Sequence, residues 1–218
     1  MTKIYYKITN AEENHNGFQY VDGLNILKEE FDNNPDHHCC AGGLYFTDTE
    51  HIFGFLNYGI YLREITLPTE NPNFKIVADE NKYRANMLIL GKRYELLNVE
   101  TIKMLMEAGA DVHTGDDYAL KWSAYNGYLE VVKYLIGAGA DVHAENDLAL
   151  RWSAEKGHLE VVKYLIEKGA DLHARDDYAL KWSACYDRLK VVKYLIEKGA
   201  NIDVIEDDPI MEKLKINR

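Results

Sequence analysis

The sequence predicts two domains, an α+β domain over residues 1–95 and an all-α solenoid over residues 96–218. The solenoid is predicted by a 30-residue unit that occurs three times without a gap, at 111–140, 141–170 and 171–200. The α+β domain is predicted by short apolar runs that Asn, Gly, Pro and Asp separate. At 218 residues the chain has room for two such domains, each with a core of its own.

Each repeat contains the pattern of two short helices. The first is expected over about 118–125 of the first repeat, after an aspartate whose carboxylate would cap the free amide hydrogens of the first turn. The second is expected over about 129–136, before a glycine that tolerates a positive φ. The expected N-caps are Asp117, Asp147 and Asp177, and the closing glycines are Gly139, Gly169 and Gly199.

The first helix is apolar on two sides, since Leu120 and Ala124 lie on one face and Tyr118 and Trp122 on another. A helix of this kind needs neighbours on both sides, which predicts a stack of repeats. We expect the core of the stack to include Trp122, Trp152, Trp182, Leu135, Leu165 and Leu195. A ligand platform built from the tryptophans is the alternative.

Incomplete units flank the three repeats. Residues 98–110 match the second half of a unit and predict an N-terminal half-repeat. Residues 201–218 begin another copy and predict a C-terminal cap.

One histidine position recurs in the repeats, at His113, His143 and His173. Packed helices lie about 8–10 Å apart, whereas metal–ligand bonds are about 2 Å long. Equivalent residues of successive repeats therefore cannot share an ion. We expect these histidines in turns, and we predict neither a metal nor a cofactor.

The segment GHLEVVKYLIEKGADLHA at 157–174 closely resembles the ankyrin repeat, and the likeness covers residues 98 to about 216. The period is 30 residues instead of about 33. The missing residues fall in the hairpin finger before the first helix, which predicts short fingers. Tyr118-Ala119-Leu120-Lys121 stands where the family has Thr-Pro-Leu-His. The third repeat has Asp187-Arg188 in place of a Gly-His step, which predicts a looser turn.

The resemblance implies a non-enzymatic adaptor that binds a host or viral protein through its finger tips and the concave face of its first helices. These surface positions differ between the repeats, whereas the framework does not; free drift at exposed sites is the other explanation. On the fingers they are Asp116, Asn146 and Asp176, and on the helices they are Tyr125, Asn126, Glu155, Lys156, Cys185 and Tyr186.

In the first domain we expect strands at 3–8, 18–21, 43–46, 59–67, 74–77 and 87–90, and a helix at 51–56. The stretches YYKIT, GFQYVDGLN, GGLYFTD and YLREITLP resemble the N-terminal part of ankyrin-repeat proteins from giant DNA viruses of amoebae, the mimivirus group. With the repeats, the resemblance spans nearly the whole chain.

A second likeness concerns activity. The order of GGLYFTD at 42–48, Asn57-Tyr58 and YLREITLP at 61–68 is similar to the strand order of poly-ADP-ribose-type ADP-ribosyltransferases. In that family a His and a Tyr hold the nicotinamide nucleotide, and a late Glu orients the acceptor. Here the early His-Gly pair is absent near Lys7, and Lys82 stands where the Glu is expected. The alternative function is thus an ADP-ribosyltransferase-like domain with a degenerate catalytic set, while our first interpretation is that the chain is not an enzyme.

Charge and cysteine content narrow the class of partner. The net charge is −11, and the sequence contains no dense patch of Lys and Arg. Nucleic acid and anionic membranes are therefore disfavoured as binding partners. No apolar run approaches the ~20 residues that a membrane span needs. The three cysteines Cys39, Cys40 and Cys185 form no disulfide framework. We therefore expect a protein partner in the reducing cytoplasm of the host cell.

The stretch PDHHCC at 35–40 spells the signature of membrane-bound palmitoyltransferases and also suggests zinc. The first interpretation requires membrane spans and a Cys/His-rich domain, neither of which the sequence contains. Neighbouring side chains of an extended segment alternate faces, so a zinc site here would need ligands from elsewhere. Turn-forming residues on both sides predict a loop that leads into the GGLYF strand.

Overall fold

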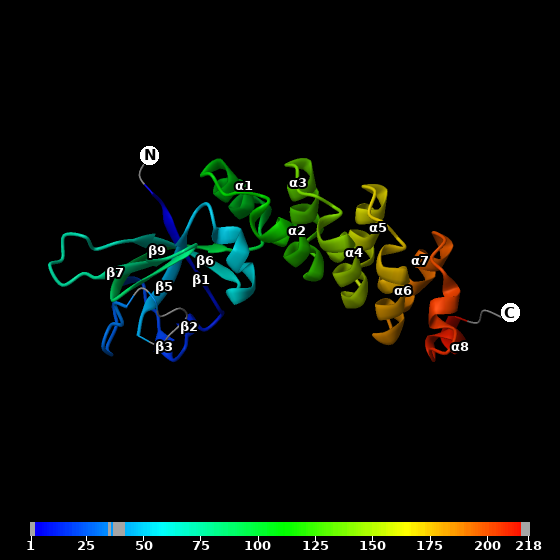
Figure 1. Ribbon diagram of the computed structural model, residues 1–218, viewed down its shortest axis with the longest axis horizontal. Coiled ribbons are helices and arrows are strands. Elements are labelled where there is room, and N and C mark those ends of the chain that lie inside the picture. The colour runs from blue at the N-terminus through cyan, green and yellow to red at the C-terminus, as the bar shows by residue number, and fades with distance from the viewer. Residues whose placement is uncertain (1–2, 35, 37–41, 215–218) are drawn as a thin grey trace. The chain divides into compact units, whose positions relative to one another are not determined.

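The computed structural model describes residues 3–34, 36 and 42–214. The chain divides into two compact units, residues 1–114 and 115–218, which Figure 1 shows as a strand-rich and a helical part. Helix α1, Val99–Glu107, belongs to the first unit and lies within the predicted half-repeat. Of the segment PDHHCC only Asp36 is among the described residues.

The first unit is built on a seven-stranded antiparallel sheet with the strand order β4-β9-β6-β1-β5-β8-β7. A two-stranded hairpin, β2 and β3, and a 3₁₀ helix, η1, Ile52–Tyr58, accompany it. One apolar cluster, centred on Leu44, Phe46, Ile65 and Leu88, forms the core. The strands are β1 Tyr5–Thr9, β2 Asn14–His15, β3 Phe18–Gln19, β4 Gly23–Ile26, β5 Leu44–Asp48, β6 Tyr61–Thr66, β7 Ile76–Asp79, β8 Lys82–Ala85 and β9 Met87–Glu95.

All six strands expected from the sequence overlap observed ones, and the helix expected at 51–56 is η1. The sequence pattern does not predict β2, β4 or β8. In β8 the reason is Arg84, which is fully buried and therefore breaks the apolar alternation that marks a strand. Its guanidinium donates to the carbonyl oxygens of Asp32, at 3.1 Å, and Asn34. Carbonyl groups of the segment between β4 and β5 thus take the place of apolar contacts.

The second unit consists of helix pairs followed by a short end segment. In Figure 1 α3, α5 and α7 lie along one side of this unit and α2, α4 and α6 along the other. The helices are α2 Thr114–Tyr125, α3 Leu129–Gly137, α4 Ala144–Lys156, α5 Leu159–Glu167, α6 Ala174–Cys185, α7 Leu189–Glu197, η2 Ile202–Ile205 and α8 Ile210–Leu214.

The second helix of each pair ends as the sequence predicts. Gly139, Gly169 and Gly199 have φ values of 107°, 100° and 102°. The N–H of Gly139 donates to the carbonyl of Ile136 at 3.1 Å, and the next N–H, of Ala140, donates to Leu135 at 3.0 Å. The positive φ at the glycine lets both amides turn back onto the helix end.

The predicted N-cap aspartates have a different role. In α4 the residues Glu145, Asn146 and Asp147 have φ values of 51°, 56° and 57°, so the right-handed helix begins after Asp147. An N-cap is usually extended, whereas this aspartate is left-handed, and its Oδ1 accepts the N–H of Asp171 in the following repeat at 2.8 Å. The same bond joins Asp117 to Asp141 and Asp177 to Asn201, both at 3.0 Å. Each aspartate therefore joins two repeats.

A buried cation holds the carbonyl groups of this left-handed turn. Arg151 donates to the carbonyl of Asn146 at 3.0 Å and to that of Glu145 at 2.7 Å. Lys121, which is 1% exposed, donates to the carbonyl of Gly115 at 3.1 Å and forms an ion pair with Glu145. These cations occupy the position at which the family's Thr-Pro-Leu-His opening has a histidine.

The turn expected to be looser in the third repeat keeps the contact of the second. His158 Nε2 donates to the carbonyl of Tyr125 at 3.0 Å, and Arg188 Nε donates to the carbonyl of Glu155 at 2.9 Å. Asp187 retains a left-handed φ of 59° and pairs with Lys213 at 2.6 Å. The substituted residues thus preserve the link between repeats.

A second buried carboxylate, Asp48, secures the end of β5 in the first unit. It is 2% exposed and contacts Lys3 Nζ at 2.8 Å, His51 Nδ1 at 2.7 Å and the Tyr83 hydroxyl at 3.1 Å. Burial alone would raise its pKa, but the hydrogen bonds from Lys3 and His51 outweigh burial and lower the pKa to about 2.

We expect Asp147→Ala to lower the free energy of unfolding by about 1–3 kcal/mol more than Asn146→Ala, because it removes the buried carboxylate that accepts the amide of Asp171. Asn146 is the matched control, since its φ of 56° is nearly that of Asp147 while its side chain is exposed. Urea denaturation followed by tryptophan fluorescence measures the difference, because all three tryptophans lie in the second unit. Equal losses would show that the bond between repeats contributes nothing.

We expect the first unit to lose stability in acid as Asp48 becomes protonated. Because the folded pKa is below the ordinary value of 3.8, the contribution is complete above about pH 4 and disappears as the pH falls through about 2. Hydrogen exchange of peptides from β1 and β5 between pH 2 and 5, corrected for intrinsic rates, measures it. Asp48→Asn should flatten this dependence, and an unchanged profile would contradict the assignment.

Candidate functional site

A row of aromatic side chains runs along the first helices of the second unit. We call it the aromatic row; it comprises Tyr118, Trp122, Tyr125, Trp152, Tyr178, Trp182 and Tyr186. The rings of Trp122 and Tyr125 stack at 5.1 Å, and the ring of Tyr125 meets Trp152 of the next repeat edge-on at 5.6 Å. The rings of Trp182 and Tyr186 stack at 5.4 Å. The row thus crosses from one repeat to the next.

The aromatic row differs from the apolar core in exposure. Leu135, Leu165 and Leu195 are completely buried. The tryptophans, which the sequence places with them, are only half-buried, and Tyr186 is 42% exposed. Leucines therefore fill the interior of the repeats, while the tryptophans lie at its edge and present part of each ring to solvent.

Lys156 lies within the aromatic row. Its Nζ is 4.6 Å from the ring centre of Tyr125, 5.8 Å from that of Tyr186 and 2.7 Å from a carboxylate oxygen of Glu155. Its pKa is raised, first by the hydrogen bond to Glu155 and then by Tyr125. The structure thus brings together Tyr125, Glu155, Lys156 and Tyr186, four of the positions chosen from the sequence.

The other chosen positions do not belong to this cluster. Asp116, Asn146 and Asp176 are exposed on the left-handed turns, at the opposite end of the first helices. Asn126 is exposed just after α2, and Cys185 is an exposed free thiol at the end of α6.

Sequence reasoning did not select Tyr118 and Tyr178 as surface residues. Each lies four positions before a tryptophan, and their rings lie 6.1 Å and 5.2 Å from Trp122 and Trp182. Residues four apart on a helix share a face, so this spacing, repeated in two units, was the available signal.

The repeated histidines are turn residues, as predicted. The N–H groups of His113, His143 and His173 donate to the aspartate two positions earlier, at 3.0, 2.9 and 2.9 Å. Within residues 3–34, 36 and 42–214, no group of three or more His, Cys, Asp or Glu side chains is placed to hold a metal ion.

The first unit contains a cavity of about 300 Å³ between β1, β5 and η1. Lys7 of β1 lines it and is 3% exposed. Its Nζ donates to the carbonyl of Tyr45 at 2.7 Å, lies 3.5 Å from His15 Nδ1 and lies 4.4 Å from the ring centre of Tyr20. Burial lowers the pKa of Lys7 from 10.5 to about 7.

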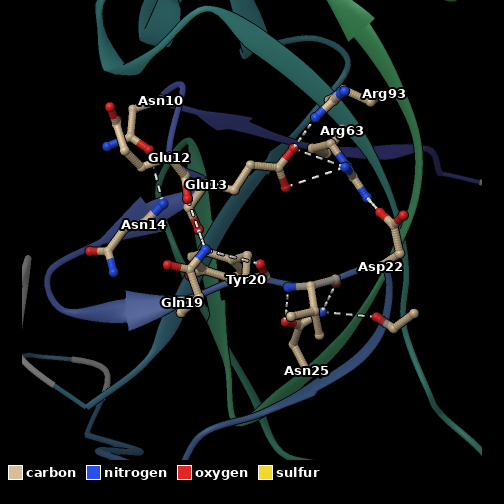
Figure 2. A network of polar contacts seen from close by, with 12 residues as sticks. Asn10, Glu12, Glu13, Asn14, Gln19, Tyr20, Asp22, Asn25, Arg63 and Arg93 are labelled. Atoms are coloured by element: carbon tan, nitrogen blue, oxygen red, sulfur yellow. Dashed lines mark hydrogen bonds and ion pairs between the residues drawn. The ribbon is translucent and has the colours of Figure 1, made fainter.

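A charged network, shown in Figure 2, holds the loop of residues 13–22. This loop brings His15 and Tyr20 to Lys7. Buried Arg63 of β6 donates from Nη1 to both carboxylate oxygens of Glu13, at 3.0 and 3.2 Å, and from Nη2 to Asp22. Arg93 of β9 adds a bond to Glu13 at 3.3 Å. Two carboxylates thus balance two guanidinium groups, and residues 13–22 are fixed over the sheet.

Lys82, which stands where the transferase resemblance expects a Glu, also lines the cavity. Its Nζ lies 3.3 Å from Asp79 and 5.8 Å from the ring centre of Tyr45. The residue at this position is therefore a cation that is paired with a carboxylate.

The family model for ankyrin repeats, in three copies, matches residues 90–176 and 120–206, which together cover more than half of the chain. The chain belongs to the ankyrin-repeat family. The resemblance of the repeats is confirmed despite their short period. Ankyrin repeats are modules of protein–protein interaction, so the family points to a protein partner.

Curated relatives come from Acanthamoeba polyphaga mimivirus and confirm the giant-virus resemblance. An uncharacterized protein is 50% identical over 129 residues, which cover 59% of this chain and 94% of the relative. Two proteins provisionally named as ankyrin repeat proteins are each 45% identical, over 131 and 127 residues. These alignments cover 59% and 57% of this ankyrin-repeat chain, but 64% and 38% of the relatives.

In the described part of this ankyrin-repeat chain, no helix is both long and apolar enough to cross a bilayer.

We expect Lys7→Met to stabilise the first unit, because an apolar side chain of similar length removes the desolvation of a buried amine. The folded pKa of Lys7 is below its ordinary value, so the destabilisation is complete below about pH 7 and disappears as the pH rises to 10.5. Hydrogen exchange of β1 peptides should therefore slow most at pH 7 and least at pH 10. Lys75→Met is the matched control, since Lys75 is exposed. Faster exchange in Lys7→Met would contradict this prediction.

Proposed function

We propose that this ankyrin-repeat protein is a non-enzymatic adaptor that binds a host or viral protein through the aromatic row and the finger tips. The observation that supports it is the half-exposed row of Tyr and Trp rings beside a separate, fully buried leucine core. The proposed setting is the cytoplasm of the host cell.

Aromatic side chains are the residues that most often dominate binding energy at protein interfaces. Trp122, Tyr125 and Trp152 already contact one another, so their rings lose little conformational freedom when a partner binds. The cost of ordering the surface is therefore low, which favours an apolar partner segment laid across the row.

The Glu155–Lys156 pair supplies the polar part of the surface. Its two side chains are 16% and 29% exposed, and Lys156 lies against rings on both sides. A partner that covers these rings must either keep this ion pair or bring a carboxylate of its own to Lys156. Specificity is expected to depend on that choice, because an unpaired buried charge is costly.

The finger tips add the contacts that differ between repeats. Asp116, Asn146 and Asp176 are exposed, and the bonds between repeats fix the turns that carry them. The three tips therefore offer polar side chains on turns that hydrogen bonds hold in place, and the residues beside each tip differ between the repeats.

Capture from amoebal lysate with the full chain as bait tests the proposal. We expect Tyr186→Ala and Lys156→Glu each to reduce the amount of a captured partner at least tenfold, a loss of about 1.4 kcal/mol or more. Lys163→Glu on α5 is the control, because Lys163 pairs with exposed Glu160 on the second-helix side. Quantitative mass spectrometry of the captured proteins, with thermal melting of each bait, measures the effect.

Capture that is equal for the wild-type bait and both aromatic-row variants would reject the surface. Loss in Lys163→Glu alone would place the interface on the second helices instead.

A further inference from the structure

We propose that the cavity of the first unit binds a small aromatic anion, a planar ring that carries a carboxylate or a phosphate, with Lys7 as its counter-charge. This site is independent of the adaptor function, because it is formed entirely by residues of the first unit.

Lys7 is a buried amine without a carboxylate partner among the described residues. Its contacts are the carbonyl of Tyr45, the ring of Tyr20 and His15 Nδ1. A buried cation is normally paired, because desolvation without compensation is expensive. An anion in the cavity would supply the missing charge.

Neighbouring cations that have only a structural role in this unit are paired with carboxylates. Arg63, directly opposite Lys7 in the sheet, is neutralised by Glu13 and Asp22. Lys82 pairs with Asp79 at 3.3 Å. Lys7 lines the same cavity as Lys82, but it has no carboxylate partner among the described residues.

The lining determines the class of anion. No Asp or Glu is among the described residues that line the cavity, so no carboxylate there would repel an anion. The aromatic residues Tyr45, Phe46, Phe55 and Tyr58 line it instead, and the rings of Phe55 and Tyr58 are 5.9 Å apart. Such walls favour a flat, apolar ligand body.

The volume limits the size of the ligand. A cavity of about 300 Å³ is at the lower end of small-molecule sites. It accommodates one ring with a single acidic group.

His15 and Tyr20 complete the electrostatic surroundings of the amine. Burial, followed by repulsion from Lys7, lowers the pKa of His15, so this ring is neutral at pH 7. Burial raises the pKa of Tyr20, so its hydroxyl stays neutral too. Binding of an anion is therefore expected to favour the protonated form of Lys7, with uptake of up to one proton by this amine near and above pH 7.

Ligand-observed NMR titration of the full chain tests the site with four probes. Benzoate and phenyl phosphate carry the ring and the anion, benzyl alcohol carries the ring alone, and acetate carries the anion alone. We expect saturable binding of at least one aromatic anion, and at least tenfold weaker binding of benzyl alcohol and acetate. The better of the two anions identifies carboxylate or phosphate as the preferred group. The affinity should fall as the pH rises from 7 to 9, because the amine must gain a proton.

Lys7→Met separates binding from folding. It should abolish binding of the aromatic anion while the first unit keeps or gains stability, and Lys75→Met should change neither. No saturable binding of either aromatic anion up to about 10 mM would overturn the proposal. It would be overturned equally if benzyl alcohol bound as tightly as benzoate and phenyl phosphate, or if Lys7→Met retained the affinity.

Discussion

The bond from one aspartate carboxylate to a backbone amide 24 residues later is the interaction on which the stack of repeats depends. It requires the left-handed turn, because only there does the carboxylate of Asp147 reach the amide of Asp171. In the first two repeats Lys121 and Arg151 add donors to carbonyl groups of this turn. The third repeat keeps the left-handed turn and the bond from Asp177 to Asn201 although Lys181 is only half-buried. The cation therefore supports the short turn, while the aspartate bond recurs in all three repeats.

The first unit also places cations inside, but it neutralises them in different ways. Arg84 is satisfied by loop carbonyls and Arg63 by two carboxylates. Both positions fix loops against the sheet, so their charges have a structural use. Lys7 lines the cavity of this unit and has one carbonyl acceptor, but no carboxylate partner among the described residues. Where an interior group costs stability without serving the fold, ligand binding is the ordinary reason for its presence.

The repeats were predictable from the sequence because their period fixes which residues must be equivalent. Helix ends at Gly139, Gly169 and Gly199 followed from the backbone freedom of glycine. The role of Asp117, Asp147 and Asp177 did not follow, because an aspartate before a helix has the same sequence pattern whether it caps that helix or bonds to the next repeat. In the first unit the pattern did not predict β8, because Arg84 is buried. The sequence also did not mark Lys7 as a site residue, since its neighbours in the cavity come from segments distant in sequence. Packing within one segment is visible in a sequence, whereas contacts between segments are not.

The distribution of tryptophan gives this protein two optically distinct halves. All three indoles lie in the aromatic row, partly open to solvent, and the first unit has only tyrosine and phenylalanine. Intrinsic emission excited near the red edge of the absorption band therefore reports on the repeats alone. A protein bound to the aromatic row would shift or quench this emission directly. A ligand in the cavity of the first unit, which has no tryptophan, would leave the emission unchanged. Events at the two units can thus be told apart in an unlabelled chain.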